Sequence, residues 1–233
     1  MKQDYSDLRL SYLATEARKK WKLDFSSPID YQKMCILLNT ITLIECPFSD
    51  TLGGVILKDS DDNCIIAINS KLILADFYEI FAHELYHFLT KSVFSAAIPS
   101  KSEMIKNEDD KNADVFANYF LMPKEALIDF FHNQCNSELS FDSVLKISLY
   151  FNVHYLRVLN RLNKENIFID LPNELIIIDE LNKRGLPNNL YMPKRTDDNI
   201  YGSGRYFALA NKLLEEEKIS EGKYNELLKY FGE

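Results

Sequence analysis

The stretch LADFYEIFAHELYHF, residues 74–88, carries the clearest structural signal in the chain. Its apolar side chains recur every three or four residues, a spacing that places them on one face of an α-helix. The residues that form this face are Leu74, Phe77, Ile80, Phe81, Leu85 and Phe88. We therefore expect a helix of about 17 residues whose broad apolar face packs into the core.

The same stretch contains the pattern His-Glu-x-x-His at residues 83–87. Four residues at about 100° each bring His83 and His87 to the same side of a helix, so both imidazoles can bind one metal ion. Glu84 would lie beside the water that such an ion carries, and could accept its proton. Zinc suits this chemistry because it has no redox activity and lowers the pKa of bound water to about 7.

An alternative interpretation makes His83 and His87 two histidines of an amphipathic helix that bracket a surface glutamate. The apolar neighbours of the pattern argue against it, because they would bury the imidazoles and the carboxylate, and buried groups of this kind need a partner. The chain has only four histidines, and two of them fall in this pattern. We therefore favour a metal site with Glu84 as the general base.

A zinc hydrolase needs a third protein ligand in addition to a water. No third histidine lies ten residues downstream, and we interpret His132 and His154 as structural histidines on separate predicted helices. Four acidic residues lie at the start of the next predicted helix, namely Glu108, Asp109, Asp110 and Asp114. The helix dipole favours most of these carboxylates there, but one of them is expected to bind the ion.

Three short runs rich in Ile and Val are predicted strands, at residues 41–48, 54–58 and 64–69. The polar turn at residues 59–63 joins the second and third runs into a hairpin. We therefore expect an α+β, mostly helical fold, in which a small antiparallel β-sheet (Ile41–Asn69) covers the helix that carries the histidines.

The rest of the chain is predicted to be mainly helical. A first helix places Leu8, Tyr12 and Ala17 on one apolar stripe, with Arg18 among the cations at its C-terminal end. Ser26-Ser27-Pro28 predicts the start of a second helix that ends near Leu38. Later helices are expected at 113–121, 123–133, 140–150, 153–162, 173–183, 206–217 and 220–231, with an apolar run at 167–171 and irregular chain at 92–111 and 185–204.

The composition excludes several classes of protein. With 46% hydrophobic and 27% charged residues, the chain is neither collagen-like nor wholly disordered. Its net charge of −8 argues against non-specific binding to nucleic acid. No signal peptide and no membrane-spanning run is expected. Four cysteines without CxxC spacing are typical of a reduced, cytoplasmic protein.

A second motif follows about 25 residues after the His-Glu-x-x-His pattern and reads DKNADVFANYFLMP, residues 110–123. The two motifs, in this order and spacing, resemble the ImmA/IrrE family of zinc metallopeptidases over roughly residues 30–165. The resemblance implies a zincin-like metallopeptidase core at residues 1–135. A helix-turn-helix-like segment at 136–165 and a C-terminal helical region at 166–233 would follow.

The resemblance also implies a Zn²⁺ ion held by His83, His87 and Asp110. Asp110 falls where the family has a glutamate and is one methylene shorter. Either the helix approaches more closely, or a neighbouring carboxylate substitutes, or metal affinity is weakened. We rank Asp110 first as third ligand, then Asp114, which could instead orient a histidine, and then Glu108.

By resemblance, the protein is a site-specific endopeptidase that cleaves a helix-turn-helix transcriptional repressor. As such an antirepressor it would derepress phage, mobile-element or stress genes. The alternative is a catalytically weak or inactive metal-binding regulator that acts by binding a repressor. Intact Glu84 argues against this alternative, because a binding module needs no general base.

The predicted helix pair at residues 140–162 has a local excess of cations at Lys146, Arg157, Arg161 and Lys164. Arg157 and Arg161 share a helix face and could contact phosphates. We favour the interpretation that the apolar side chains of the pair pack against the core and that these cations are solvated. We therefore expect a protein partner, and no direct binding to nucleic acid or membrane.

Overall fold

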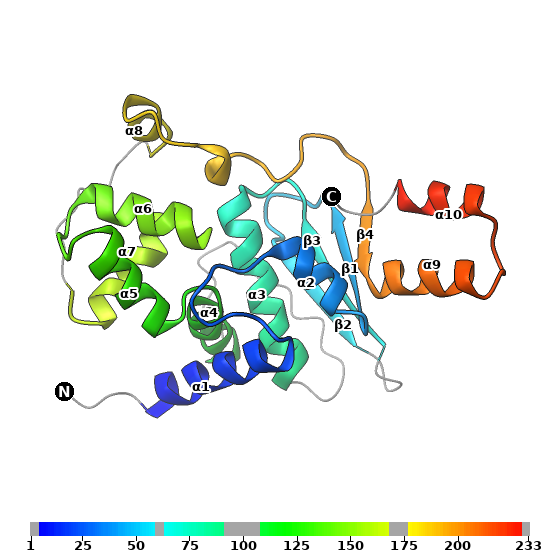
Figure 1. Ribbon diagram of the computed structural model, residues 1–233, viewed down its shortest axis with the longest axis horizontal. Helices are drawn as coiled ribbons and strands as arrows, with labels where there is room; N and C mark the ends of the chain where they lie inside the picture. The colour runs from blue at the N-terminus through cyan, green and yellow to red at the C-terminus, as the bar shows by residue number, and fades with distance from the viewer. Residues whose placement is uncertain (1–4, 59–62, 91–107, 168–176, 230–233) are drawn as a thin grey trace.

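The computed structural model describes residues 5–58, 63–90, 108–167 and 177–229 (Figure 1). The helices in these ranges are α1 (Tyr5–Lys20), α2 (Tyr31–Leu37), α3 (Leu74–Thr90), α4 (Glu108–Leu121), α5 (Lys124–Gln134), α6 (Phe141–Phe151), α7 (Tyr155–Lys164), α8 (Ile177–Lys183), α9 (Arg205–Glu215) and α10 (Glu221–Leu228). The strands are β1 (Ile41–Cys46), β2 (Gly54–Lys58), β3 (Cys64–Asn69) and β4 (Tyr201–Gly204), and η1 (Asn189–Tyr191) is a 3₁₀ turn. The fold is mostly helical with one small sheet, so the α+β class is confirmed.

The four strands form one mixed sheet in the order β2-β3-β1-β4. The predicted hairpin is present, since β2 pairs antiparallel with β3. The expectation of an antiparallel sheet was wrong, because β1 pairs parallel with β3, Ile41 lying opposite Cys64. Along the chain, β2 comes between β1 and β3. In the sheet it occupies the outer edge beside β3, so β1 and β3 are neighbours that run in the same direction.

The fourth strand lies in the segment 185–204, which was predicted to be irregular. β4 pairs antiparallel with β1. This part of the C-terminal region is therefore a strand, although the region as a whole was predicted to be helical. Gly204 ends β4 with φ of 63°, and a Cβ at this position would lie 2.2 Å from the Ile41 carbonyl oxygen. Glycine is therefore required where the chain leaves the sheet and enters α9.

The sheet positions α3, which runs through the middle of the molecule with the sheet on one side and α4 to α7 on the other (Figure 1). Alternate residues of β1 and β3, such as Leu43 and Ile66, are buried in the core. β2 packs directly on α3 at Gly54, where a Cβ would lie 2.6 Å from the Ile80 side chain. The absence of a side chain at Gly54 thus permits this close approach.

Helix α1 packs on α4 with a face that matches the predicted one only at its C-terminal end, where Ala17 is buried. Leu8 and Tyr12 are exposed, whereas Leu10 and Ala14 are buried. Arg18, one of the cations predicted at the C-terminal end of this helix, is also buried. Its guanidinium donates to the carbonyl oxygens of Phe120 at 2.7 Å and Leu121 at 3.3 Å, so it satisfies carbonyls at the C-terminal end of α4.

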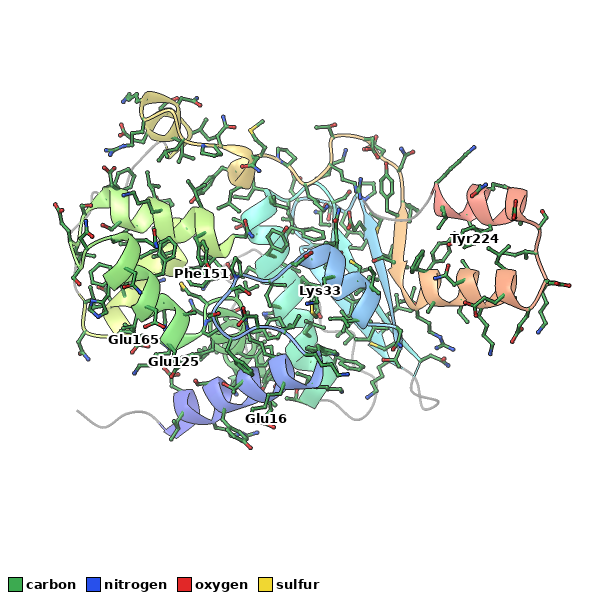
Figure 2. All side chains as sticks on the ribbon, in the orientation of Figure 1. Glu16, Lys33, Glu125, Phe151, Glu165 and Tyr224 are labelled. Atoms are coloured by element: carbon green, nitrogen blue, oxygen red, sulfur yellow. The ribbon has the colours of Figure 1, made fainter. Side chains whose placement is uncertain are left out.

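The predicted helix pair is present as α6 and α7, joined through Asn152, which has the left-handed φ of 56°. Phe151 lies between α6 and α5, in edge-to-face contact with Phe130 (Figure 2). Tyr191 of η1 reaches the turn from the C-terminal region. Its hydroxyl lies 2.8 Å from Ser148 Oγ and accepts a hydrogen bond from the backbone N–H of Tyr155.

Several predicted boundaries change. α2 is capped by Asp30, whose side chain accepts from the Lys33 N–H, so it begins three residues after Pro28. α4 begins at Glu108, inside the predicted irregular segment 92–111, because its acidic first turn favours a helix start. Residues 91–107, most of the apolar run 167–171 and the start of the helix expected at 173–183 lie outside the described residues.

Helices α9 and α10 form a pair beside β4, in which Tyr224 of α10 points toward α9 and donates to Asn211 at 2.6 Å (Figure 2). Among the described residues, no helix combines the length and the apolar character needed to cross a membrane.

Candidate metal centre

The two histidines of α3 are buried side by side. His83 is 1% exposed and His87 is 0% exposed, and their Nε2 atoms are 3.1 Å apart. Two imidazole nitrogens bound to one zinc ion at 2.0–2.1 Å in tetrahedral geometry would be about 3.3 Å apart. The histidines are thus already spaced for a shared ion.

Asp110 from the first turn of α4 completes a group of three donors. Its Oδ1 lies 3.6 Å from Nε2 of His87 and 4.0 Å from Nε2 of His83. The three donor atoms lie within 4.8 Å of one another, and the group could hold a metal ion. The set of two imidazoles and one carboxylate fits zinc in both donor type and number, because a catalytic zinc takes three protein ligands.

The outer nitrogen of each imidazole faces a further carboxylate of α4. Nδ1 of His83 lies 2.9 Å from Oδ1 of Asp114, and Nδ1 of His87 lies 3.4 Å from Oδ2 of Asp109. The hydrogen bond between Asp114 and Nδ1 of His83 favours the tautomer that leaves the Nε2 lone pair of His83 free for an ion, whereas Asp109 is near Nδ1 of His87 without forming a hydrogen bond to it. Asp114 therefore occupies the orienting position that the sequence offered as one alternative.

Asp109 has a role at this site that sequence analysis did not assign to it. Its other oxygen accepts a hydrogen bond of 3.2 Å from the hydroxyl of Tyr86, whose pKa is raised by burial and by this nearby carboxylate. Tyr86 thereby fixes the carboxylate that faces His87. The sequence offered one signal for this, since Tyr86 lies inside the His-Glu-x-x-His pattern.

Glu108, the third-ranked candidate ligand, does not join the group. Its carboxylate lies 3.9 Å from the ammonium of Lys111 and is mostly exposed to solvent. Glu108 begins α4, and its side chain leaves the helix on a different side from that of Asp110.

Glu84 lies on the side of α3 that faces the sheet, and it is 0% exposed. A Cβ at Gly54 of β2 would lie 3.5 Å from Cγ of Glu84, so the strand covers this side chain. Because Glu84 follows His83 directly in the helix, its carboxylate is placed next to the histidine pair but on a neighbouring face.

The other two histidines lie in different surroundings, as expected. His132 is exposed, with Nδ1 2.6 Å from Ser137 Oγ. His154 caps α7 by accepting from the Leu156 N–H, and burial lowers its pKa. Neither residue belongs to the group of metal-binding donors.

Arg161 of α7 is not solvated, which corrects the interpretation made from the sequence, whereas Arg157 is partly exposed. Arg157 forms a two-pronged ion pair with Glu79 of α3. Arg161 is 1% exposed and donates to Glu165 and Asn118, while its guanidinium lies 3.9 Å from the centre of the Tyr119 ring. Arg161 therefore faces the protein interior, and Arg157 is paired with Glu79 at a partly exposed position.

Comparison with models of known families matches residues 39–163 to Peptidase_M78, described as the IrrE N-terminal-like domain. The matched stretch covers more than half of the chain and includes α3 and α4, which carry all the residues of the group. A search of curated proteins gave no match to the chain.

Proposed function

Since the chain belongs to the Peptidase_M78 family, the IrrE N-terminal-like domain family, we propose that it is a zinc-dependent metalloendopeptidase. We propose as its substrate a helix-turn-helix transcriptional repressor. One observation carries the assignment of chemistry: two buried Nε2 atoms and one carboxylate oxygen converge, while carboxylates of the same helix face both Nδ1 atoms. A structural pair of histidines would need no such arrangement.

His83, His87 and Asp110 would hold the zinc ion, Asp114 would keep the His83 imidazole in the binding tautomer, and the Asp109 carboxylate would add a favourable charge beside His87. Zinc, when bound, acts as a Lewis acid that activates water near neutral pH and stabilises negative charge on a peptide carbonyl. Glu84 then accepts the proton of the attacking water and donates it to the leaving amine.

The shorter side chain of Asp110 is compatible with this role because α4 packs closely on α3. Its first turn, with Asp109 and Asp110, lies beside His87, and its second turn, with Asp114, lies beside His83. Two donor atoms bound to one zinc ion are about 3.3 Å apart. The distances from Oδ1 of Asp110 to Nε2 of His87 and of His83, 3.6 Å and 4.0 Å, exceed this value by 0.3 Å and 0.7 Å. Binding of one ion by all three residues would therefore require the Asp110 carboxylate to move toward the histidines.

Variants of the α4 carboxylates test the assignment of the third ligand. We expect Asp110→Ala to weaken zinc affinity most, because it removes a donor, and Asp110→Glu to retain zinc. Asp114→Ala should weaken affinity by about 10–100-fold, because it removes an orienting partner only. Competition with a chromophoric chelator measures all three. If Asp114→Ala releases the metal while Asp110→Ala retains it, the two roles are reversed.

The proposal of a protein substrate is supported by the position of the α7 cations. Arg161 is buried and Arg157 is paired with Glu79, so neither guanidinium is freely available to contact phosphates. The net charge of −8 also opposes association with nucleic acid. We therefore propose no direct contact with DNA, and a cytoplasmic location, which agrees with the four free cysteines.

Incubation of the zinc-loaded chain with a purified helix-turn-helix repressor, ideally the product of an adjacent gene, tests the function. We expect cleavage at one site, detected by mass spectrometry, and loss of cleavage when a chelator removes the metal. Restoring Zn²⁺ should restore cleavage. Stable binding to the repressor without cleavage under any of these conditions would instead identify a metal-binding regulator.

A further inference from the structure

Arg157 of α7 forms an ion pair with α3 at a point near the candidate metal centre. Its Nε donates to Oε2 of Glu79 at 2.9 Å, and its Nη2 donates to Oε1 of the same carboxylate. Glu79 precedes His83 by four residues, so the two side chains leave α3 on the same face, one turn apart. The ion pair therefore joins the helix-turn-helix-like pair of helices to the face of α3 that carries a metal ligand.

A small cavity between α3, α4 and α7 places the same ion pair beside Asp114. Its lining consists of Glu79, Asp114, Asn118, Leu121, Val153 and Arg157. Asp114 is the residue whose Oδ1 faces Nδ1 of His83 at 2.9 Å. Two partly buried carboxylates and one partly exposed guanidinium thus line one small cavity, and one of the carboxylates faces a proposed metal ligand.

The charges in this cavity influence one another. Burial raises the pKa of Glu79, the Arg157 guanidinium lowers it, and the Asp114 carboxylate raises it further. The pKa of Arg157 is lowered by burial but raised overall, by Glu79 first and then by Asp114 and Asp76. Arg157 therefore offsets the mutual repulsion of Glu79 and Asp114, which is stronger at these partly buried positions than it would be in open solvent.

We propose that Arg157 is a positioning residue for the metal centre: by neutralising Glu79, it lets Asp114 remain against Nδ1 of His83. This inference rests on the proposed metal-dependent function and deepens it. It also connects α7 to the metal site, because a displacement of α7 would change the charge that Asp114 experiences. Without the guanidinium, Glu79 would repel Asp114 and the His83 imidazole would lose its orienting partner.

Metal affinity of the full-length chain tests this inference, with Co²⁺ as a spectroscopic probe and Zn²⁺ in competition with a chelator. We expect Arg157→Met to weaken the affinity for both ions by about tenfold and to change the visible absorption of bound Co²⁺. Arg157→Lys should restore part of the affinity, because it keeps the charge. Lys164→Met is the matched control, since Lys164 is on the same helix but pairs with Asp7 at the surface.

The double variant Glu79→Gln/Arg157→Met separates a charge effect from a packing effect. It removes both charges of the ion pair and leaves neither partner unpaired, so we expect it to fold and to bind Co²⁺ with nearly wild-type affinity and spectrum. A double variant as weak as Arg157→Met, or an Arg157→Met variant with unchanged affinity and spectrum, would overturn the inference alone. A wild-type chain that binds neither ion would overturn the proposed function as well.

Discussion

Replacement of either His83 or His87 by alanine is expected to abolish stoichiometric zinc binding. Each variant leaves one imidazole and one carboxylate, and two protein ligands are fewer than the three that catalytic zinc sites use. The loss should exceed the 10–100-fold effect typical of an orienting residue. Metal analysis after dialysis should give about one zinc per chain for the wild type and much less for either variant.

His132→Ala is the matched control for these two variants. His132 is exposed, and its Nδ1 contacts Ser137, so its removal takes away a histidine without touching the buried group. Its zinc content should equal that of the wild type. One retained zinc per chain in either His83→Ala or His87→Ala, at wild-type affinity, would contradict the proposed metal centre.

Glu84→Gln is expected to remove hydrolysis while leaving zinc binding intact. The glutamine amide has nearly the same shape as the carboxylate, so the packing beneath β2 should be preserved, but it cannot accept a proton from water. A general base contributes about 10²–10⁴-fold to the rate, and the variant should lose at least that factor. The measurement pairs the rate of repressor cleavage with the zinc content of the same preparation.

The two readouts of the Glu84→Gln experiment have distinct meanings. Retained zinc with lost cleavage supports the role of Glu84 as general base. Cleavage at the wild-type rate would show that another group takes the proton, whereas loss of zinc would place Glu84 in a structural role.

The helix with the histidines was predictable because its signals are local. The period of three to four residues determines which side of α3 is buried, and the same period places His83 and His87 together. The two motifs also identified the family, and the match of residues 39–163 confirms that resemblance. Such inferences require only residues that are near one another in the sequence.

The assignment of the carboxylates could not be completed from sequence. Asp109, Asp110 and Asp114 all lie within two turns of α4, and their periodicity alone cannot tell which one faces the histidines. The crossing of α4 over α3 determines this, and the crossing depends on side chains elsewhere, such as Arg18, which holds the far end of α4. Glu108 is therefore a possible third ligand by sequence alone, and only its position in the structure, near Lys111, separates it from the histidines.

Buried cations and the fourth strand escaped prediction for a related reason. Arg18 and Arg161 are of a residue type that is usually exposed, and only partners distant in sequence explain their burial. β4 has the sequence Tyr-Gly-Ser-Gly, which lacks the apolar alternation of a typical strand. β4 is extended because it is hydrogen-bonded to β1, and its own residues have no strong preference for a strand.

The position of β4 has a consequence for where this protein can be divided. The family match ends at residue 163, but β1 is hydrogen-bonded on one of its sides to a strand at residues 201–204. A fragment cut at residue 163 would leave the N–H and C=O groups on that side of β1 without their strand partner, and such open strands recruit other chains. The smallest self-contained unit is therefore longer than the segment that defines the family, and it includes residues that bear no motif.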